Sequence, residues 1–251
     1  MERSPISSNP SFDDFADALW GLAAVYQEGG ISVSAGCGDP SARARFESTP
    51  PHLRTYIVSK VLHDTALFQD VLAQGRPLAD NQEAVARFCF RNKVRIPGEA
   101  LELITADRVI EIYDLTLMQR FRSVNFFTYT SHSLLDLESR PYFDLFRKSP
   151  EIEFAIMEKA KGILGGELKD PDYKFVGDHK LWEINSPRKI VTKLRSAVVS
   201  PILNADDGTV AGLIHVCEVL DQREFTVIPN EPVPVAEVDP LPDFKSPISP
   251  A

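Results

Sequence analysis

The sequence has no uninterrupted apolar run that approaches the roughly 18–20 residues needed to cross a bilayer. Its N-terminal stretch, MERSPISSNPSF, also lacks the apolar segment of a secretory signal. We therefore expect a chain that does not insert into a membrane. The expected location is the cytoplasm, and a nuclear location stays open.

Positive charge is in the minority. The chain has 27 Lys and Arg against 36 Asp and Glu, which gives a net charge of −9. A broad nucleic-acid surface needs clustered Lys and Arg, so we expect no nucleic-acid partner. Hydrophobic content of 43% and charged content of 25% are ordinary for a globular protein.

Cysteine is scarce and unpaired. The three cysteines, Cys37, Cys89 and Cys217, form no CxxC motif. This pattern indicates neither a disulfide framework nor a zinc site. We expect reduced thiols, with Cys89 and Cys217 in apolar cores.

The short motifs of known chemistries are missing too. There is no GxSxG sequence, no P-loop and no dinucleotide fingerprint. No two histidines have the spacing of metal ligands on one helix or strand face. The five histidines are His52, His63, His132, His179 and His215. We therefore assign no catalytic residue and no metal ligand, and an enzyme is the less favoured interpretation.

The clearest pattern that is present predicts a β-hairpin over residues 191–220. The first arm alternates apolar and polar residues, whereas the second arm, residues 210–219, is mostly apolar on both faces. Such a strand is typically central in a sheet that is covered on both sides. Asp207 and Gly208 supply the turn, and Pro201 is compatible with an edge or a bulge of the first arm.

Helical patterns dominate the first part of the chain. Residues 12–26, 51–73 and 80–90 carry apolar side chains at helical spacing. Residues 31–51, rich in Gly, Ser and Pro, are predicted to form a loop. Residues 11–98 are therefore expected to be a mostly α-helical N-terminal region.

After residue 101 the pattern changes to strands. We predict strands at 108–114, 118–127 and 180–184, short helices or turns at 131–137 and 141–146, and a capped helix over 149–166. The hairpin follows. Strands interrupted by one helical block indicate an α+β fold with helices on one face of an antiparallel sheet.

The composition changes again near the end of the chain. Residues 222–251 contain seven of the 19 prolines and carry two basic against five acidic residues. We interpret them as a proline-rich tail or linker. The predicted organisation is a disordered tail over 1–10, the helical region over 11–98, a sheet domain over 99–221 and the tail over 222–251.

Residues 101–221 also carry motifs that resemble a known family. The closing motif consists of Pro-Ile, an acidic turn ending in Gly and a later Gly: Pro201, Ile202, Asp206, Asp207, Gly208 and Gly212. The opening motif consists of Asp114, Asn125, Ser133 and Leu137. In order and spacing these motifs resemble the PAS domain superfamily, small sensors built on a five-stranded antiparallel sheet.

The resemblance implies a non-catalytic signalling or regulatory module. Such a module binds a small ligand or a protein partner and transmits a conformational change through flanking helices. Residues 12–26 are the natural flanking helix: they either pair two chains into a homodimer or pack within their own chain. The photochemical cysteine motif of light-sensing relatives is absent, and residues 151–164 contain no histidine for heme. Neither flavin nor heme is therefore indicated.

Aromatic residues in this half are candidates for the walls of a ligand pocket, although an ordinary core position is favoured for any single one. The expected walls are Phe126, Tyr129, Phe143, Phe146, Phe154 and Trp182. The candidate ligand-binding residues are Asn125, Phe127, Tyr129, Phe146, Trp182 and His215.

Two alternatives stay open. One is a small-molecule isomerase or dehydratase of the conical α+β barrel type, which needs an acid–base pair in its cavity, and the candidates are Tyr129, Asp178 and His179. Here two strands precede the main helical block, and this order favours the PAS-like interpretation. The other is a protein-interaction scaffold in which the helical N-terminal half binds the partner.

Overall fold

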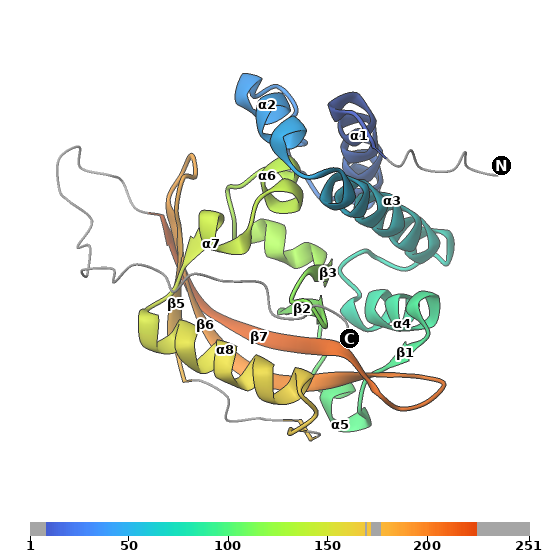
Figure 1. Cartoon of the computed structure of the whole chain (residues 1–251), viewed down its shortest axis with the longest axis vertical. Coiled ribbons are helices and arrows are strands. Elements are labelled where there is room, and N and C mark those ends of the chain that lie inside the picture. The colour runs from blue at the N-terminus through green and yellow to red at the C-terminus, as the bar shows by residue number, and fades with distance from the viewer. Residues whose placement is uncertain (1–8, 169, 172–176, 225–251) are drawn as a thin grey trace.

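The computed structural model describes residues 9–168, 170–171 and 177–224, which form a mixed α+β fold around a curled antiparallel sheet (Figure 1). The tails predicted over residues 1–10 and 222–251 fall mostly outside these described residues. None of the described helices combines the length and the apolar character that a bilayer span requires.

The sheet has seven strands within the described residues, and all its pairings are antiparallel. The order is β3-β2-β7-β6-β5-β4, and β1 pairs with β6 off this path. The strands are β1 (Val94–Arg95), β2 (Arg108–Asp114), β3 (Gln119–Arg122), β4 (Phe146–Arg147), β5 (His179–Glu183), β6 (Ile190–Asn204) and β7 (Val210–Glu224).

The predicted hairpin is confirmed. β6 and β7 pair from Ile190 opposite Glu224 to Leu203 opposite Val210, and Gly208 in the turn has a φ of 72°. β7 is central, between β2 and β6, as its two apolar faces predict. Pro201 lies where β6 has β7 on one side only, because β5 pairs with β6 up to Leu194 and β1 begins at Leu203. Its missing amide therefore costs no ladder hydrogen bond on that side.

Between residue 9 and β2, the structure has five helices. They are α1 (Phe12–Glu28), α2 (Pro40–Ser48), α3 (Pro51–Ala73), α4 (Asn81–Asn92) and α5 (Gly98–Leu101). The loop predicted over residues 31–51 is therefore wrong for α2. The side chain of Asp39 accepts a hydrogen bond from the backbone N–H of Ser41, and Pro40 occupies the first turn. An Asp-Pro pair is a good helix start, and it outweighs the Gly, Ser and Pro content of residues 31–51.

The remaining helices lie between β3 and β5 in the chain. They are the 3-10 helix η1 (Val124–Thr128), α6 (Leu134–Ser139), α7 (Tyr142–Leu145) and α8 (Pro150–Leu164). The strand predicted over 118–127 is correct only to Arg122, after which η1 turns the chain. α8 begins at Pro150 and ends before Gly165 and Gly166, as expected.

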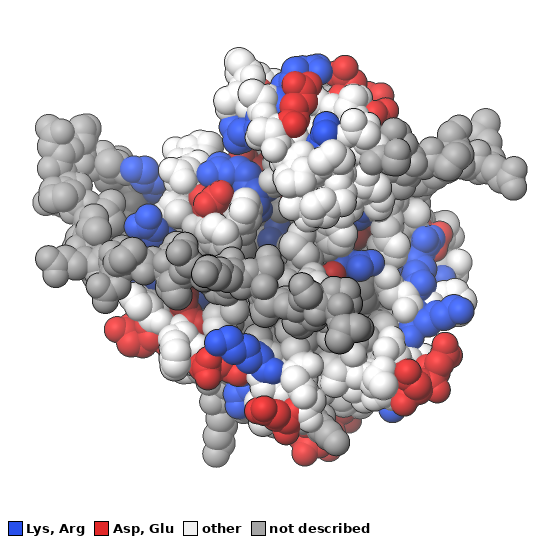
Figure 2. Space-filling model, viewed as in Figure 1, with Lys and Arg blue, Asp and Glu red and all other residues white. Residues whose placement is uncertain are grey.

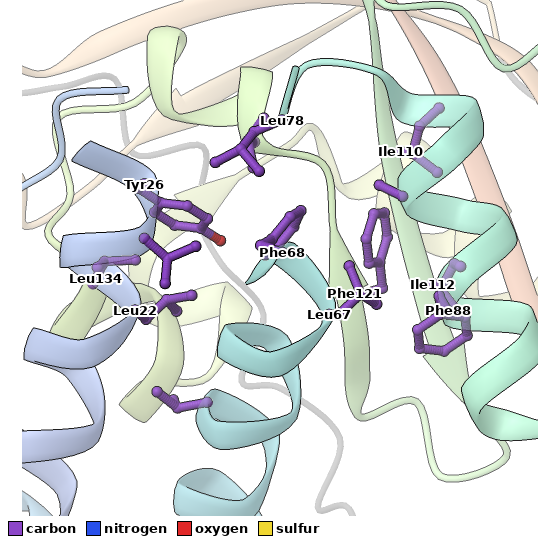
Figure 3. Close-up of a cluster of buried hydrophobic side chains, with 14 of the residues drawn as sticks. Leu22, Tyr26, Leu67, Phe68, Leu78, Phe88, Ile110, Ile112, Phe121 and Leu134 are labelled. Atoms are coloured by element: carbon purple, nitrogen blue, oxygen red, sulfur yellow. The ribbon is translucent and has the colours of Figure 1, made fainter. Parts of the chain in front are cut away.

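Helices cover both faces of the sheet, which corrects the expectation of helices on one face. On the first face, α1, α3 and α4 form one apolar core with β2, β3, β6 and β7 (Figure 3). The ring of Phe121 in β3 lies 6.2 Å from Phe68 of α3 and 5.7 Å from Phe88 of α4, centroid to centroid. On the second face, α8 packs against β6 and β7 through Ala160 and Ile163.

The helical layer on the first face has a physical reason. The apolar stripes of the N-terminal helices need an apolar surface to bury them, and this face of β2 and β7 supplies it. The stripe of α1, which includes Phe15, Leu19 and Leu22, is fully buried within its own chain. This is the intramolecular packing of the two alternatives considered for residues 12–26. The extra strands β1 and β4, two residues each, extend the expected five to seven.

A buried ion network joins the N-terminal helices to the second half of the chain. The ammonium of Lys60 in α3 donates to Asp64 Oδ2 and to Glu138 Oε2 of α6, each at 2.7 Å. All three side chains are almost completely buried. Because removing one member of such a network leaves buried charge unpaired, the network holds α3 and α6 together.

Candidate functional site

A small cavity lies on the second face of the sheet. Its volume is about 20 Å³, enough for roughly one ordered water. Strands β2, β5, β6 and β7 form its floor, and η1, α7 and the loop after β4 form its cover. Its apolar lining includes Val109, Phe126, Leu181, Leu194 and Val219. Its polar lining includes Glu111, Tyr142, Lys148, His179, His215 and Cys217.

Strand periodicity brings these side chains to one face. Side chains two residues apart on a strand point to the same side, so Val109 and Glu111 of β2 face the cavity while Ile110 faces the helical core. The pairing register then places His215 of β7 opposite Glu111 and Cys217 opposite Val109.

Lys148 covers the cavity from the loop between β4 and α8. Its Nζ donates to the hydroxyl of Tyr142 at 2.6 Å and lies 4.2 Å from the centroid of that ring. Burial lowers the pKa of Lys148, and the charge of Glu111 only partly offsets this. Burial also raises the pKa of Tyr142 well above its ordinary value, so the hydroxyl keeps its proton.

Glu111 is the carboxylate of the site. Its Oε1 accepts from Gln119 Nε2 at 3.0 Å and lies 3.7 Å from Nε of Arg122. The buried Arg122 guanidinium also stands over Phe126, 4.6 Å from the ring centroid. Nε and Nη1 of Arg122 have no hydrogen-bond partner among the described residues. A charge-assisted donor therefore stays available beside the cavity.

His215 and Cys217 form a neutral pair. Burial lowers the pKa of His215 to about 3, and the charge of Lys148 adds to this effect. Nε2 of His215 lies 2.8 Å from Ser196 Oγ and 3.3 Å from Cys217 Sγ. Burial raises the pKa of the Cys217 thiol far above its ordinary value. A reactive thiolate needs the opposite shift, so this pair is not an activated nucleophile.

His179 presents an unused acceptor. Its Nδ1 lies 3.1 Å from the carbonyl oxygen of Gly177, and burial lowers the pKa of the ring, which is therefore neutral at pH 7. Because a carbonyl only accepts, Nδ1 carries the proton and Nε2 has the lone pair. Nε2 is buried without a partner among the described residues.

A second carboxylate ties the cover to the sheet. Glu183 of β5 accepts four hydrogen bonds, from Thr130 Oγ1 at 2.5 Å, Ser131 N at 2.6 Å, Ser131 Oγ at 2.7 Å and Ile190 N at 3.2 Å. Burial raises the pKa of Glu183, but these hydrogen bonds outweigh it and the pKa lies below its ordinary value. The segment that leads into α6 is thereby held in place by an ionised, buried side chain.

Of the six candidate ligand-binding residues, Tyr129 and His215 line the cavity. Phe146 lies behind the cavity lining, with ring centroids 5.6 Å from Phe126 and 5.1 Å from Tyr142. Phe127 does not line the cavity and packs against both the helical core and the apolar cluster beside the cavity.

The other three candidates, Phe127, Asn125 and Trp182, do not line the cavity. Phe127 packs 5.3 Å from the ring of Tyr26. The side chain of Asn125 donates to the carbonyl oxygen of Arg108 at 2.6 Å and so ties η1 to β2. Trp182 points to the opposite face of β5 from Leu181 and is 38% exposed.

Two expected pocket walls and one candidate acid lie at the surface. Phe143 and Phe154 are 65% and 69% exposed, because α7 and the first turns of α8 place them outward. Asp178 pairs with Arg195 at 2.8 Å and with Lys193 at 3.0 Å. These hydrogen bonds, first that of Arg195, lower the pKa of Asp178 to about 2, and Asp178 is not part of the cavity lining.

Sequence reasoning missed Glu111, Tyr142 and Lys148. One signal was available: Glu111 interrupts an otherwise apolar strand, and a lone charge in the middle of a central strand needs a buried partner or a function. Lys148 gave no such signal, because the surrounding Arg-Lys-Ser-Pro stretch has the composition of an exposed loop.

Comparison with protein-family models found no match, and comparison with curated protein sequences found none either. Within residues 9–168, 170–171 and 177–224, no group of three or more His, Cys, Asp and Glu side chains is arranged to hold a metal ion. The cavity itself is therefore the main indication of function.

Proposed function

We propose that this chain is a non-catalytic signalling or regulatory module with a PAS-like sensor domain over residues 99–221. A small ligand binds in the cavity, and the conformational change passes to the flanking N-terminal helices. One observation carries the proposal: β2 and β7 contribute to both faces of the sheet. On one face their side chains line the cavity, and on the other face they pack against the N-terminal helices.

The order of elements supports the PAS-like part of the proposal. Within residues 99–221, two strands, β2 and β3, are followed by the helical block from η1 to α8 and then by three antiparallel strands, β5 to β7. Two strands before this helical block are the order that favours the PAS-like interpretation over the conical α+β barrel. The two remaining strands, β1 and β4, are short additions to this arrangement.

The proposed coupling runs through alternate residues of the same strands. In β2, Glu111 faces the cavity, while Ile110 and Ile112 pack in the helical core. A ligand that shifts β2 relative to β7 therefore changes the packing of α3 and α4. The ion network of Lys60 and Glu138 gives a second connection, from α6, which lies between η1 and α7 in the chain, to α3.

The chemical state of the cavity supports binding rather than catalysis. His215 and Cys217 are both neutral, so they supply neither a thiolate nor an imidazolium. Buried titratable groups in a cavity are nevertheless typical of functional sites. A ligand that makes hydrogen bonds would use them without any covalent step.

One observation favours the isomerase or dehydratase alternative. His179 and Tyr129, two of its three candidate residues, line the same cavity as Glu111. A carboxylate and a neutral imidazole are suitable for proton transfer at a carbon beside a carbonyl group. This second function requires turnover, whereas the first requires only binding.

The test combines ligand detection with hydrogen exchange. Native mass spectrometry of the purified chain, followed by thermal-shift screening, identifies a ligand. Hydrogen exchange with and without that ligand then measures the coupling. We expect slower exchange in β2 and β7 together with a change in α3 and α4. Absence of any ligand contradicts the sensor proposal, and binding without a change in the helices contradicts the coupling.

The same material separates the alternatives. Turnover of an enolisable ketone that is lost on Glu111→Gln supports the enzyme. A stable homodimer or partner complex, with neither a ligand nor turnover, supports the interaction scaffold.

A further inference from the structure

Beside the cavity, among the described residues, the two cations Arg122 and Lys148 face the one buried carboxylate of Glu111; the other carboxylate that acts on Lys148, Glu153, is exposed. Glu111 lies 3.7 Å from Arg122, so these two opposite charges offset each other. The ammonium of Lys148 contacts the hydroxyl of Tyr142, which is neutral. His179 and His215 are also neutral at pH 7, because burial lowers both pKa values.

The charges of Glu111 and Glu153 both act on Lys148, but only partly offset the effect of burial. Glu153 is exposed on α8, and its Oε1 accepts from the backbone N–H of Lys148 at 3.3 Å, not from the ammonium. Among the described residues, the ammonium donates to the hydroxyl of Tyr142 and forms no ion pair with a carboxylate. A partly buried ammonium without a direct ion pair is unfavourable, and either loss of its proton or binding of an anion removes this cost. The anion relieves it without changing the protein's own groups.

The polar groups around the cavity define what such an anion must offer. The Nζ of Lys148 is a donor, and the hydroxyl of Tyr142 accepts from it and keeps its own O–H as a second donor. On the β5 side, Nε2 of His179 is an acceptor that lacks a donor. A matching ligand therefore has an anionic acceptor at one end and a hydroxyl donor beside it.

We propose that the cavity binds a short-chain 2-hydroxycarboxylate, with its carboxylate on Lys148 and Tyr142 and its hydroxyl donating to His179. The short alkyl group then packs on the apolar lining formed by Val109, Leu181, Leu194 and Val219. This inference rests on the proposed sensor function and names the ligand class of that same site.

The cover of the cavity yields to admit the ligand. The present volume of about 20 Å³ holds roughly one water, which the ligand displaces. Tyr142 belongs to the four-residue helix α7, and Lys148 belongs to the loop before α8. The floor strands, in contrast, are held by continuous ladder pairing. Opening therefore moves α7 and this loop, and the sheet keeps its register.

The first test uses the unaltered chain and three probes of similar size: lactate, propionate and lactamide. Thermal shift and isothermal titration measure binding at pH 7. We expect lactate to bind tightest, propionate to bind more weakly because it lacks the hydroxyl, and lactamide to bind weakest because it lacks the charge. Equal binding of lactate and lactamide overturns the proposal, and so does no binding of either acid.

The second test removes the charge. Lys148→Met removes the ammonium and keeps most of the length of the side chain. We expect it to weaken lactate binding roughly tenfold or more, as the loss of one charge-assisted hydrogen bond does. The matched control is Lys180→Met, an exposed lysine of β5. Unchanged lactate affinity in Lys148→Met overturns the proposal. If Lys148→Met does not fold, the comparison of the three probes decides.

The third test addresses the hydrogen bond between the hydroxyl group of the ligand and His179. We expect His179→Leu to lower the affinity for lactate to that for propionate and to leave the affinity for propionate unchanged. An equal loss for both acids overturns the assignment of His179. A neutral ligand that binds independently of Lys148 contradicts this inference while the sensor function stands. If no ligand of any class binds, both fail.

Discussion

The two faces of the sheet bury different kinds of side chain. Toward α1, α3 and α4 the central strands present Ile110, Ile112, Ile214 and Val216, all at most 2% exposed. Toward the cavity the same strands present Glu111, His215 and Cys217 among apolar residues. Apolar burial stabilises a fold, whereas buried polar groups cost free energy unless they are satisfied.

This difference separates stability from function within one sheet. The helical face has no unpaired polar group on β2 or β7, while on the cavity face His179 and Arg122 keep buried nitrogen atoms without partners in the described part of the chain. Proteins retain such groups mostly where a ligand or a reaction uses them. Charges elsewhere are mixed: the described part of the surface seen in Figure 2 carries interspersed basic and acidic side chains.

The largest effect is expected in the helical core. Phe121→Ala removes a fully buried ring between Phe68 and Phe88, and we expect a loss of about 3–5 kcal/mol in the free energy of unfolding. Urea unfolding measures it. Leu115→Ala, at a residue that is 54% exposed, is the control and should change stability by less than about 0.5 kcal/mol. Similar losses in the free energy of unfolding for both variants would contradict a single core that joins the helices to the sheet.

A comparable effect is expected in the ion network. Lys60→Met leaves Asp64 and Glu138 buried without their cation, and we expect a loss of about 3–5 kcal/mol. The control is Lys161→Met, whose partner Glu158 lies 2.9 Å away at the surface, with an expected loss below about 1 kcal/mol. A small loss on Lys60→Met would show that α3 and α6 are not held together by this network.

A smaller effect is expected at Glu183. Glu183→Gln replaces one of two accepting oxygens by a donor, and we expect a loss of about 1–3 kcal/mol at pH 7. The pKa of Glu183 is lower in the folded than in the unfolded chain, where it is near 4.5. Its contribution is therefore fully present above pH 4.5 and is lost as the pH falls through the folded pKa.

The acid dependence of Glu183 is measured by urea unfolding between pH 7 and pH 3. Glu183→Gln should unfold with a shallower decrease of stability at low pH than the unaltered chain. Glu218→Gln, at a strand position where the side chain is 43% exposed, is the control and should keep the full decrease. Parallel curves for all three chains would argue against an ionised Glu183 in the fold.

The smallest effect on stability is expected at the cavity itself. His179→Leu removes a buried nitrogen that lacks a partner and also the hydrogen bond from Nδ1 to the carbonyl oxygen of Gly177. These effects oppose each other, so we expect a change within about 1 kcal/mol. Thermal unfolding without ligand measures it. A large loss would mean that His179 has a structural role, and the contrast between the two faces would weaken.

Local pattern was enough for the hairpin and most helices. The double apolar character of residues 210–219 predicted a central strand covered on both sides, and β7 is that strand. The local pattern did not identify which elements cover the second face of β7. The apolar stripe of a helix indicates that this face of the helix is buried, but it does not indicate which element buries it. For this reason the N-terminal helices on the far face of the sheet were not expected.

The candidate site was only partly predictable. His215 and Tyr129 were found because they lie on strongly patterned or aromatic stretches, and both line the cavity. Lys148 and Tyr142 come from short elements whose sequence resembles a surface loop. Their burial follows from the path of the chain between α6 and α8, which no local spacing encodes.

The amino-acid sequence by itself determined where strands and helices form, because apolar periodicity and turn residues act over a few neighbours. Tertiary structure alone decided that Glu111, Lys148, His179 and His215 share one cavity. These residues are far apart in the chain, and strand register and the fold of the cover bring them together. Their pKa values and hydrogen bonds follow from this arrangement, because both depend on burial and on neighbouring residues contributed by other elements.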